Sequence, residues 1–193
     1  MKLKRKFYQR EDVVQIAREL LGKYLFTNFN NQLTGGMITE TEAYIGITDR
    51  ASHSFGGRRT ARNEHMYANA GTAYVYICYG IHHLFNVVTN KKEIPDAVLI
   101  RAIQPTHGIE TILKRRGMKE IRKNISGGPG TVGFALGINK MHSGLDLLSD
   151  KIWIEERKIS INPKDIKVTK RIGVESAGEA AHYPYRFVLN VIP

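Results

Sequence analysis

Short apolar or alternating segments, separated by turn-forming residues, constrain the fold of this chain most strongly. Runs of this length that are broken by tight turns are typical of antiparallel strands. Strands are expected at residues 23–29, 36–45, 73–79, 82–90, 95–103, 151–155 and 185–191, and helices at 11–21, 107–123 and 131–137. The sequence therefore predicts an α+β fold with a mostly antiparallel sheet, flanking helices and a protruding β-hairpin around Tyr79-Gly80-Ile81.

The single cysteine, Cys78, limits how the chain can stabilise itself. One cysteine permits neither an intrachain disulfide nor a cysteine zinc cage, so a hydrophobic core has to hold the fold. The 193 residues show no repeat or Pro/Ser-rich linker. We therefore expect one compact domain over residues 1–193, present as a monomer. The charged N-terminus has no apolar stretch typical of a secretion signal, so we expect a cytoplasmic protein associated with the bacterial nucleoid.

The charge of the chain is strongly positive. Lys and Arg number 29 against 18 Asp and Glu, which gives a formal net charge of +11. A basic surface attracts polyanions, of which nucleic acid is the commonest. An anionic membrane is the alternative, but no apolar span or basic amphipathic helix favours it. Nucleic acid is therefore the expected partner. The basic residues between 114 and 123 could contact phosphates or form only a solvated helix face.

One strand carries carboxylates on one face. Because strand residues alternate, Ile38, Glu40, Glu42 and Tyr44 should share a side of the strand at 36–45. Surface strands also show such patterns. If the face is concave, burial and the like charge of Glu40 would raise the pKa of Glu42. Glu42 would then suit a general base near neutral pH.

The aromatic run at 74–79 offers a second functional pattern. Tyr74 and Tyr76 should lie on one strand face, whereas Tyr79 should lie at the tip of the hairpin. Aromatic strands are mostly explained by core packing. An exposed tyrosine in a basic protein, however, is suited to stacking on bases or wedging between them. The turn should place Asn86 roughly across from Tyr76.

Two further patterns carry less information. Gly128-Pro129-Gly130-Thr131-Val132-Gly133 formally fits G-x-G-x-x-G, but the βαβ unit that a dinucleotide site requires is missing. A turn that enters a helix, whose N-terminus could hold one phosphate, is the simpler interpretation. The seven histidines show no metal-ligand spacing, and His82 and His83 should point to opposite faces of a strand. We expect no metal and no cofactor.

Several separated motifs resemble the alkyladenine (3-methyladenine) DNA glycosylase family. They occur in order over nearly the whole chain and comprise Ile38–Gly46, Ala51–Ser54, Gly56–Thr60 with Arg62-Asn63, Gly71–Gly80, Leu99–Ala102, Ser126–Pro129, Ile138–Lys140 and Arg171–Val174. The resemblance implies a monofunctional enzyme that flips damaged purines out of double-stranded DNA and hydrolyses the N-glycosidic bond during base excision repair. Substrates of the 3-methyladenine, 7-methylguanine and hypoxanthine type are expected, with an abasic site as product.

The resemblance also assigns roles to individual residues. Glu42 matches the general base, and Arg101 a residue near the water and the phosphate of the flipped nucleotide. The pocket walls match Tyr44, His53 and Tyr76, and Asn86 matches a floor residue that disfavours the 2-amino group of guanine. Tyr79 matches the side chain that fills the gap in the duplex. Leu99 and Val174 match supports of the pocket.

Two other functions fit part of the sequence. A noncatalytic nucleic-acid-binding module would share the charge and the aromatics, but would gain little from a carboxylate that repels phosphate. A nuclease would use a metal held by acids, for which Glu40, Glu42 and Asp49 are the only close set. A duplex that contains a lesion distinguishes the three through abasic sites, binding alone, or phosphodiester cuts.

Overall fold

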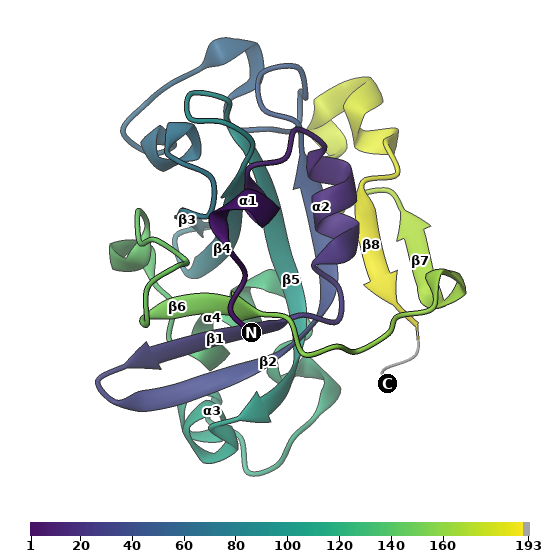
Figure 1. The fold of residues 1–193 in the computed structure, drawn as a ribbon. Helices are drawn as coiled ribbons and strands as arrows, with labels where there is room; N and C mark the ends of the chain where they lie inside the picture. The colour runs from purple at the N-terminus through teal and green to yellow at the C-terminus, as the bar shows by residue number, and fades with distance from the viewer. Residues whose placement is uncertain (191–193) are drawn as a thin grey trace.

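The computed structural model describes residues 1–190 and is built on an eight-stranded sheet (Figure 1). Six strands follow the order β3-β4-β5-β2-β1-β6, while β8 pairs with β2 and β7 with β8. All strand pairs within these residues are antiparallel, which confirms the predicted α+β class. The strands are β1 (Tyr24–Phe29), β2 (Gln32–Tyr44), β3 (Ala73–Cys78), β4 (His82–Thr89), β5 (Asp96–His107), β6 (Ile152–Glu155), β7 (Ile166–Thr169) and β8 (Arg186–Leu189).

One edge of the long strand β2 pairs with two different strands. The strand pairs with β5 along one edge, whereas its other edge pairs first with β1 and then, from Glu40 to Glu42, with β8. Register shifts interrupt the β2–β5 pairing between Ile38 and Thr41. The fork brings the C-terminal strand β8 beside the two carboxylates of β2, although about 145 residues separate them in the chain.

Helices cover both faces of the sheet (Figure 1). Helix α2 (Val13–Glu19) packs on β2, where the Thr41 hydroxyl donates to the Ala17 carbonyl at 2.7 Å. Helix α4 (Pro129–Leu136) packs on β4 and β5, and α3 (Ile109–Arg116) packs beside α4. A short helix, α1 (Arg5–Tyr8), precedes them. Apolar residues of these helices, such as Ile16 and Val132, pack against the two faces of the sheet and are fully buried.

The structure differs from the sequence-based prediction in the extent of some elements and in the presence of others. The helix expected over 107–123 is only α3, because Gly117 adopts a left-handed conformation (φ 61°) that ends it. Strand β7 and helix α1 were not predicted. The strand expected at 185–191 is β8, and residue 191 lies outside the described residues. None of the described helices has the length and apolar character needed to cross a bilayer.

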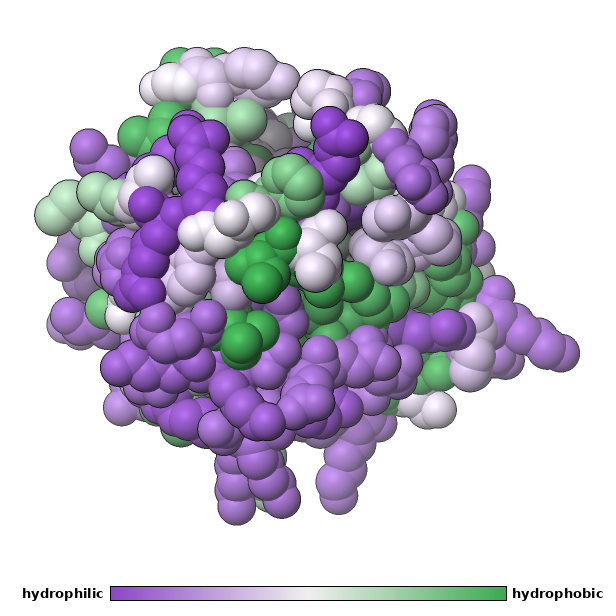
Figure 2. Space-filling view, turned by 90° about the horizontal axis from the view of Figure 1, so that it is seen from above, coloured by the Kyte–Doolittle hydropathy of each residue, from purple (hydrophilic) through white to green (hydrophobic). Residues whose placement is uncertain are grey.

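The β3–β4 pair ends in the exposed connection Tyr79–Ile81. Tyr79 (φ 51°) and Gly80 (φ 75°) are both left-handed, and the Tyr79 side chain is 88% exposed. The pairing sets Tyr74 opposite Asn86 and Tyr76 opposite Leu84, so the expected juxtaposition of Asn86 with Tyr76 is wrong by two residues. That this hairpin protrudes stays a prediction. Seen from above, hydrophilic side chains surround a smaller apolar area of the surface (Figure 2).

Candidate active site

One row of paired residues across the sheet positions the candidate site. Glu42 of β2 lies opposite Leu99 of β5, Leu99 lies opposite Asn86 of β4, and Asn86 lies opposite Tyr74 of β3. Directly paired residues project from the same face of a sheet. Tyr44 and Tyr76 follow Glu42 and Tyr74 by two residues and therefore share this face. Residues from four strands thus meet above one face of the sheet.

Glu42 is the most deeply buried member of this group, with no exposed side-chain surface. Its Oε1 accepts a hydrogen bond from the Ile172 backbone N–H at 2.9 Å and lies 3.3 Å from Arg101 Nη1. Its Oε2 accepts the Tyr44 hydroxyl at 2.8 Å. Burial raises the pKa of Glu42, although Arg101 and the two hydrogen bonds oppose it, and Glu40 adds only a small further increase. The carboxyl group therefore ionises with more difficulty than an ordinary glutamate.

Arg101 is held between two carboxylates. Its Nε donates to Glu40 Oε1 at 2.6 Å, and Glu40 Oε1 also accepts Arg186 Nε at 2.7 Å. Burial alone would lower the pKa of Arg101, but the neighbouring Glu42 and Glu40 outweigh it and raise that pKa. Arg101 therefore stays charged beside Glu42. Arg186 completes this network, and no sequence pattern identified it.

A cavity of about 400 Å³ lies next to Glu42. Its walls include the rings of Tyr44, His53 and Tyr76, the three residues predicted to stack on a base. The His53 ring lies 4.5 Å from the Tyr76 ring, edge to face, and its Nδ1 bonds the Tyr74 hydroxyl at 2.8 Å. The volume falls in the range of small-molecule pockets, about 300–1,000 Å³. The cavity is thus lined by aromatic rings from β2, β3 and the loop between them.

The remaining predicted site residues also line this cavity. Asn86 and Leu99 belong to its lining with Arg101, Val174 and Tyr79. The Asn86 Nδ2 donates to the backbone carbonyls of Tyr74 and Leu84, which fixes the orientation of its amide. Glu42 itself is not part of the lining, whereas Tyr44, Arg101 and Ile172, which contact its carboxylate oxygens, are.

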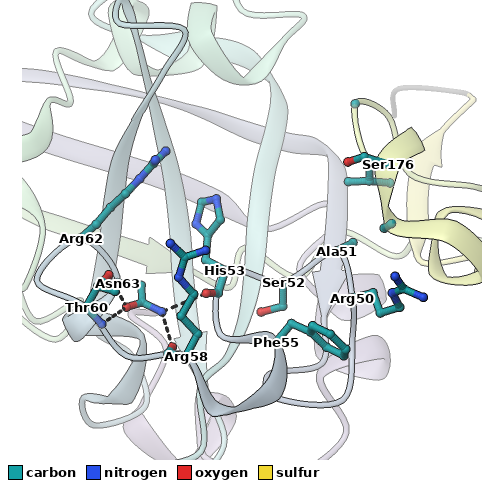
Figure 3. Close-up of a pocket in the computed structure, with 13 residues that line it drawn as sticks. Arg50, Ala51, Ser52, His53, Phe55, Arg58, Thr60, Arg62, Asn63 and Ser176 are labelled. Atoms are coloured by element: carbon teal, nitrogen blue, oxygen red, sulfur yellow. Dashed lines mark hydrogen bonds between the residues drawn. The ribbon is translucent and has the colours of Figure 1, made fainter.

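Burial and two nearby arginines lower the pKa of His53. His53 lines the cavity, and burial of its ring, followed by the charges of Arg62 and Arg58, lowers its pKa to about 4. The imidazole is therefore neutral near pH 7. Asn63 fixes the surrounding loop, because its Nδ2 donates to the His53 carbonyl at 3.1 Å and to the Arg58 carbonyl at 2.8 Å (Figure 3). Sequence reasoning gave Asn63 no role.

A buried ion pair contacts one wall of the cavity. Both terminal nitrogens of Arg171 bind the Asp49 carboxylate, and both side chains are almost fully buried. Arg171 also donates to the carbonyls of Ala43 and Ala180, each at 2.9 Å, and its guanidinium stacks 4.7 Å from the Tyr44 ring. This pair joins the loop after β2 to the C-terminal segment that supplies Ile172 and Val174.

The acids considered for a metal site are each bound to an arginine. Glu40 pairs with Arg101 and Arg186, Glu42 with Arg101, and Asp49 with Arg171. Within residues 1–190 no group of three His, Cys, Asp or Glu side chains is arranged to hold a metal ion. The G-x-G-x-x-G segment forms the start of α4, where Gly130 and Gly133 allow close packing against His82 and His83 of β4.

Comparison with known proteins identifies relatives over almost the whole chain. Residues 6–193 match the family model described as methylpurine-DNA glycosylase. A protein from Clostridium perfringens (strain 13 / Type A) is 43% identical over 198 residues, which cover 98% of this chain and 96% of that protein. One from Chlamydia felis (strain Fe/C-56) is 44% identical over 186 residues, covering 96% and 94%. Both are named "Putative 3-methyladenine DNA glycosylase".

Proposed function

The chain belongs to the methylpurine-DNA glycosylase family, and from that premise we propose that it turns single damaged purines out of duplex DNA into the cavity of about 400 Å³. The chain is a hydrolase that acts on N-glycosyl bonds of DNA. The names of its relatives point to 3-methyladenine, to which we add 7-methylguanine and hypoxanthine. The product is an abasic site, which base excision repair then processes.

The observation that carries this proposal is a buried carboxylate beside an aromatic cavity. The pKa of Glu42 is raised by burial, so its ionised form is a stronger base than an exposed glutamate. A water proton passes to Glu42 while the water oxygen bonds the sugar C1′. The C1′–N bond breaks, and its electrons leave with the base. The carboxylate also favours the positive charge that develops on the sugar.

Water has to reach Glu42 for this reaction. The Tyr44 hydroxyl occupies Oε2, and Tyr44 is also the wall on which we expect the purine to stack. We therefore propose that entry of the base displaces the Tyr44 hydroxyl and leaves Glu42 Oε2 free to bind water. We assign two roles to Arg101, 3.3 Å from Oε1: it keeps the carboxylate ionised and attracts the phosphate of the flipped nucleotide.

The walls favour purines that carry a positive charge. Alkylation at a ring nitrogen makes the purine cationic, and the electron-rich faces of Tyr44 and Tyr76 attract a cation. His53 does not oppose this, because a pKa of about 4 keeps it neutral near pH 7. Neutral lesions such as hypoxanthine require protonation as they leave. Asn86, Leu99 and Val174 close the floor, where Asn86 is assigned to exclude the 2-amino group of guanine.

The exposed Tyr79 is assigned to the gap in the duplex. Extrusion of a base costs a few kcal/mol of stacking, which an inserted side chain and phosphate contacts offset. Tyr79 is 88% exposed at the β3–β4 connection and lines the edge of the cavity. Among residues 1–190 no lysine lines the cavity, so we propose hydrolysis without a Schiff base or strand cleavage.

Incubation with methylated duplex DNA tests the function. We expect free 3-methyladenine and 7-methylguanine in solution by chromatography, and strands that stay intact until alkali cleaves the abasic sites. A hypoxanthine-containing duplex tests the neutral class in parallel. Binding without base release would indicate a noncatalytic module, and phosphodiester cuts without free base would indicate a nuclease. Either result contradicts the proposal.

A further inference from the structure

A second cavity of about 370 Å³ opens beside the base cavity. The loop from Arg50 to Asn63 forms one side of it, and residues Gly173–Ala177 form the other (Figure 3). His53, Arg62 and Val174 belong to the lining of both cavities. One ligand can therefore extend from the base cavity into the second. The proposed function assigns nothing to this second space.

Three arginines line the second cavity: Arg50, Arg58 and Arg62. All three are exposed, and none of them pairs with a carboxylate in the part of the chain that the structure describes. Their neighbour Arg59 differs, because it is bound to Glu64 at 2.6 Å and to Glu93 at 2.5 Å and does not line the cavity. The loop thus pairs one arginine with carboxylates and leaves three arginines without such a partner in the lining of the second cavity.

We propose that the second cavity binds a phosphodiester of the DNA strand that carries the flipped base, one or two linkages from that nucleotide. This inference rests on the proposed function, because a base in the first cavity places its flanking phosphates within reach of the second. Guanidinium groups bind phosphate through paired charge-assisted hydrogen bonds. The Ser176 and Thr60 side chains line the same space and add hydroxyl groups.

Neutral linkages in the DNA test this assignment. Each test duplex holds a tetrahydrofuran abasic analogue and a single methylphosphonate, which occupies one of the three linkages on either side of the analogue. The affinity for each duplex is measured for wild type, Arg50→Ala and Arg58→Ala. These two arginines make no side-chain hydrogen bond in the described chain, whereas Arg62 donates to the Ile77 carbonyl and stacks on Tyr76. Arg59→Ala is the matched control from the same loop.

We expect one neutral linkage to weaken wild-type binding by about 10-fold, the loss of one charge-assisted bond. In Arg58→Ala or Arg50→Ala the same linkage should cost almost nothing more, whereas Arg59→Ala should keep the wild-type pattern. If the substitution and the neutral linkage weaken binding by independent factors at every position, the assignment is overturned. If wild type binds this duplex without any coupling, yet releases base from a separate lesion-containing duplex, only this inference is refuted and the glycosylase function stays intact.

A separate observation concerns the buried Asp49–Arg171 pair. Neither side chain lines the base cavity, yet each neighbours a residue that does. Arg171 stacks on Tyr44 and directly precedes Ile172, whose N–H donates to Glu42 at 2.9 Å. Asp49 accepts the Ala51 N–H at 3.0 Å, at the start of the segment that leads to His53. We infer that the pair is a positioning element that aligns Glu42 and Tyr44.

Asp49→Asn and the milder Arg171→Lys test this role, which depends on Glu42 being the base. Both should lower kcat at unchanged folded fraction. Both should also move the acidic limb of the pH–rate profile to higher pH, because a displaced Ile172 N–H no longer favours ionised Glu42. Asp146→Asn, which breaks the distant Arg5–Asp146 pair, should leave that limb in place. The role is refuted if folded Arg171→Lys keeps the wild-type kcat and profile. If base release does not depend on Glu42, the proposed function fails instead.

Discussion

At Glu42, burial and hydrogen bonding act on the pKa in opposite directions. Two donors and the charge of Arg101 favour the ionised form, but removal from water outweighs them and raises the pKa. From the sequence we predict a raised pKa for Glu42, with burial and the charge of Glu40 as its causes. The contribution of Glu40 is small because its own charge is bound by Arg101 and Arg186. Those two contacts join residues more than 60 positions apart, and no local pattern reveals them.

Tyr44→Phe tests how the Tyr44 hydroxyl acts on Glu42. The substitution keeps the ring but removes one hydrogen bond to the carboxylate. The pKa of Glu42 should then rise further, so the acidic limb of the single-turnover rate should move to higher pH. Tyr74→Phe, whose hydroxyl bonds His53, serves as control and should not move the limb. Superimposable profiles for Tyr44→Phe and wild type would show that the hydroxyl has no such effect.

Tyr79→Ser tests the wedge at the β3–β4 connection. Because the side chain is 88% exposed, its loss should leave the free energy of unfolding within about 0.5 kcal/mol of wild type. Base release from a paired duplex should fall by about 10-fold or more, while release from a single strand should change little. Val168→Ser, an exposed change on β7, is the control. An equal loss on both substrates would argue against a wedge.

At the scale of elements, the prediction from strand alternation succeeded, whereas those that depended on turn geometry failed. Alternation along β2 correctly brought Glu42 and Tyr44 to one face, because side chains of a strand alternate whatever their partners are. The position of Asn86 depended on the register of β3 and β4, which the length of the connection fixes. The three-residue connection Tyr79–Ile81 places Asn86 opposite Tyr74. Likewise, the predicted helix over 107–123 is too long, because the left-handed Gly117 ends α3 inside the charged run.

Gly133→Ala tests the close packing of α4 on β4. A Cβ at this position would lie 2.3 Å from the His83 carbonyl oxygen, so the helix would have to move away from the strand. We expect the free energy of unfolding to fall by about 1–3 kcal/mol, although alanine is the better helix former. Denaturant unfolding measures this. Gly128→Ala, where the nearest atom is 3.8 Å away, is the control. Equal stability of the two variants would contradict the packing argument.

For the whole molecule, the net charge of +11 predicted a nucleic-acid partner, and membership of a DNA glycosylase family agrees with that. The sequence also predicted the α+β class and seven of the strands approximately. The cavities could not be predicted, because each combines the loop between β2 and β3 with residues beyond 170. A single domain and a monomeric state stay predictions.

Salt dependence of binding measures the electrostatic part of DNA recognition. Cations that neutralise several phosphates release counterions, so affinity for undamaged duplex should fall by about 10³-fold between 50 and 200 mM salt. The single-turnover rate at saturating enzyme should change far less, because the reacting groups are shielded inside the cavity. A fall of less than about 3-fold in affinity would mean that the basic surface contributes little to DNA binding.

The most direct test of the account is a comparison of binding and base release in Glu42→Gln. The amide keeps the size of the side chain but cannot take the proton from water. The variant should bind lesion-containing duplex within about 3-fold of wild type, while single-turnover release of the base falls by about 10²–10⁴-fold. Glu64→Gln, at an exposed surface position, controls for loss of a negative charge. Release by folded Glu42→Gln at the wild-type rate would contradict the assignment of Glu42 as the general base.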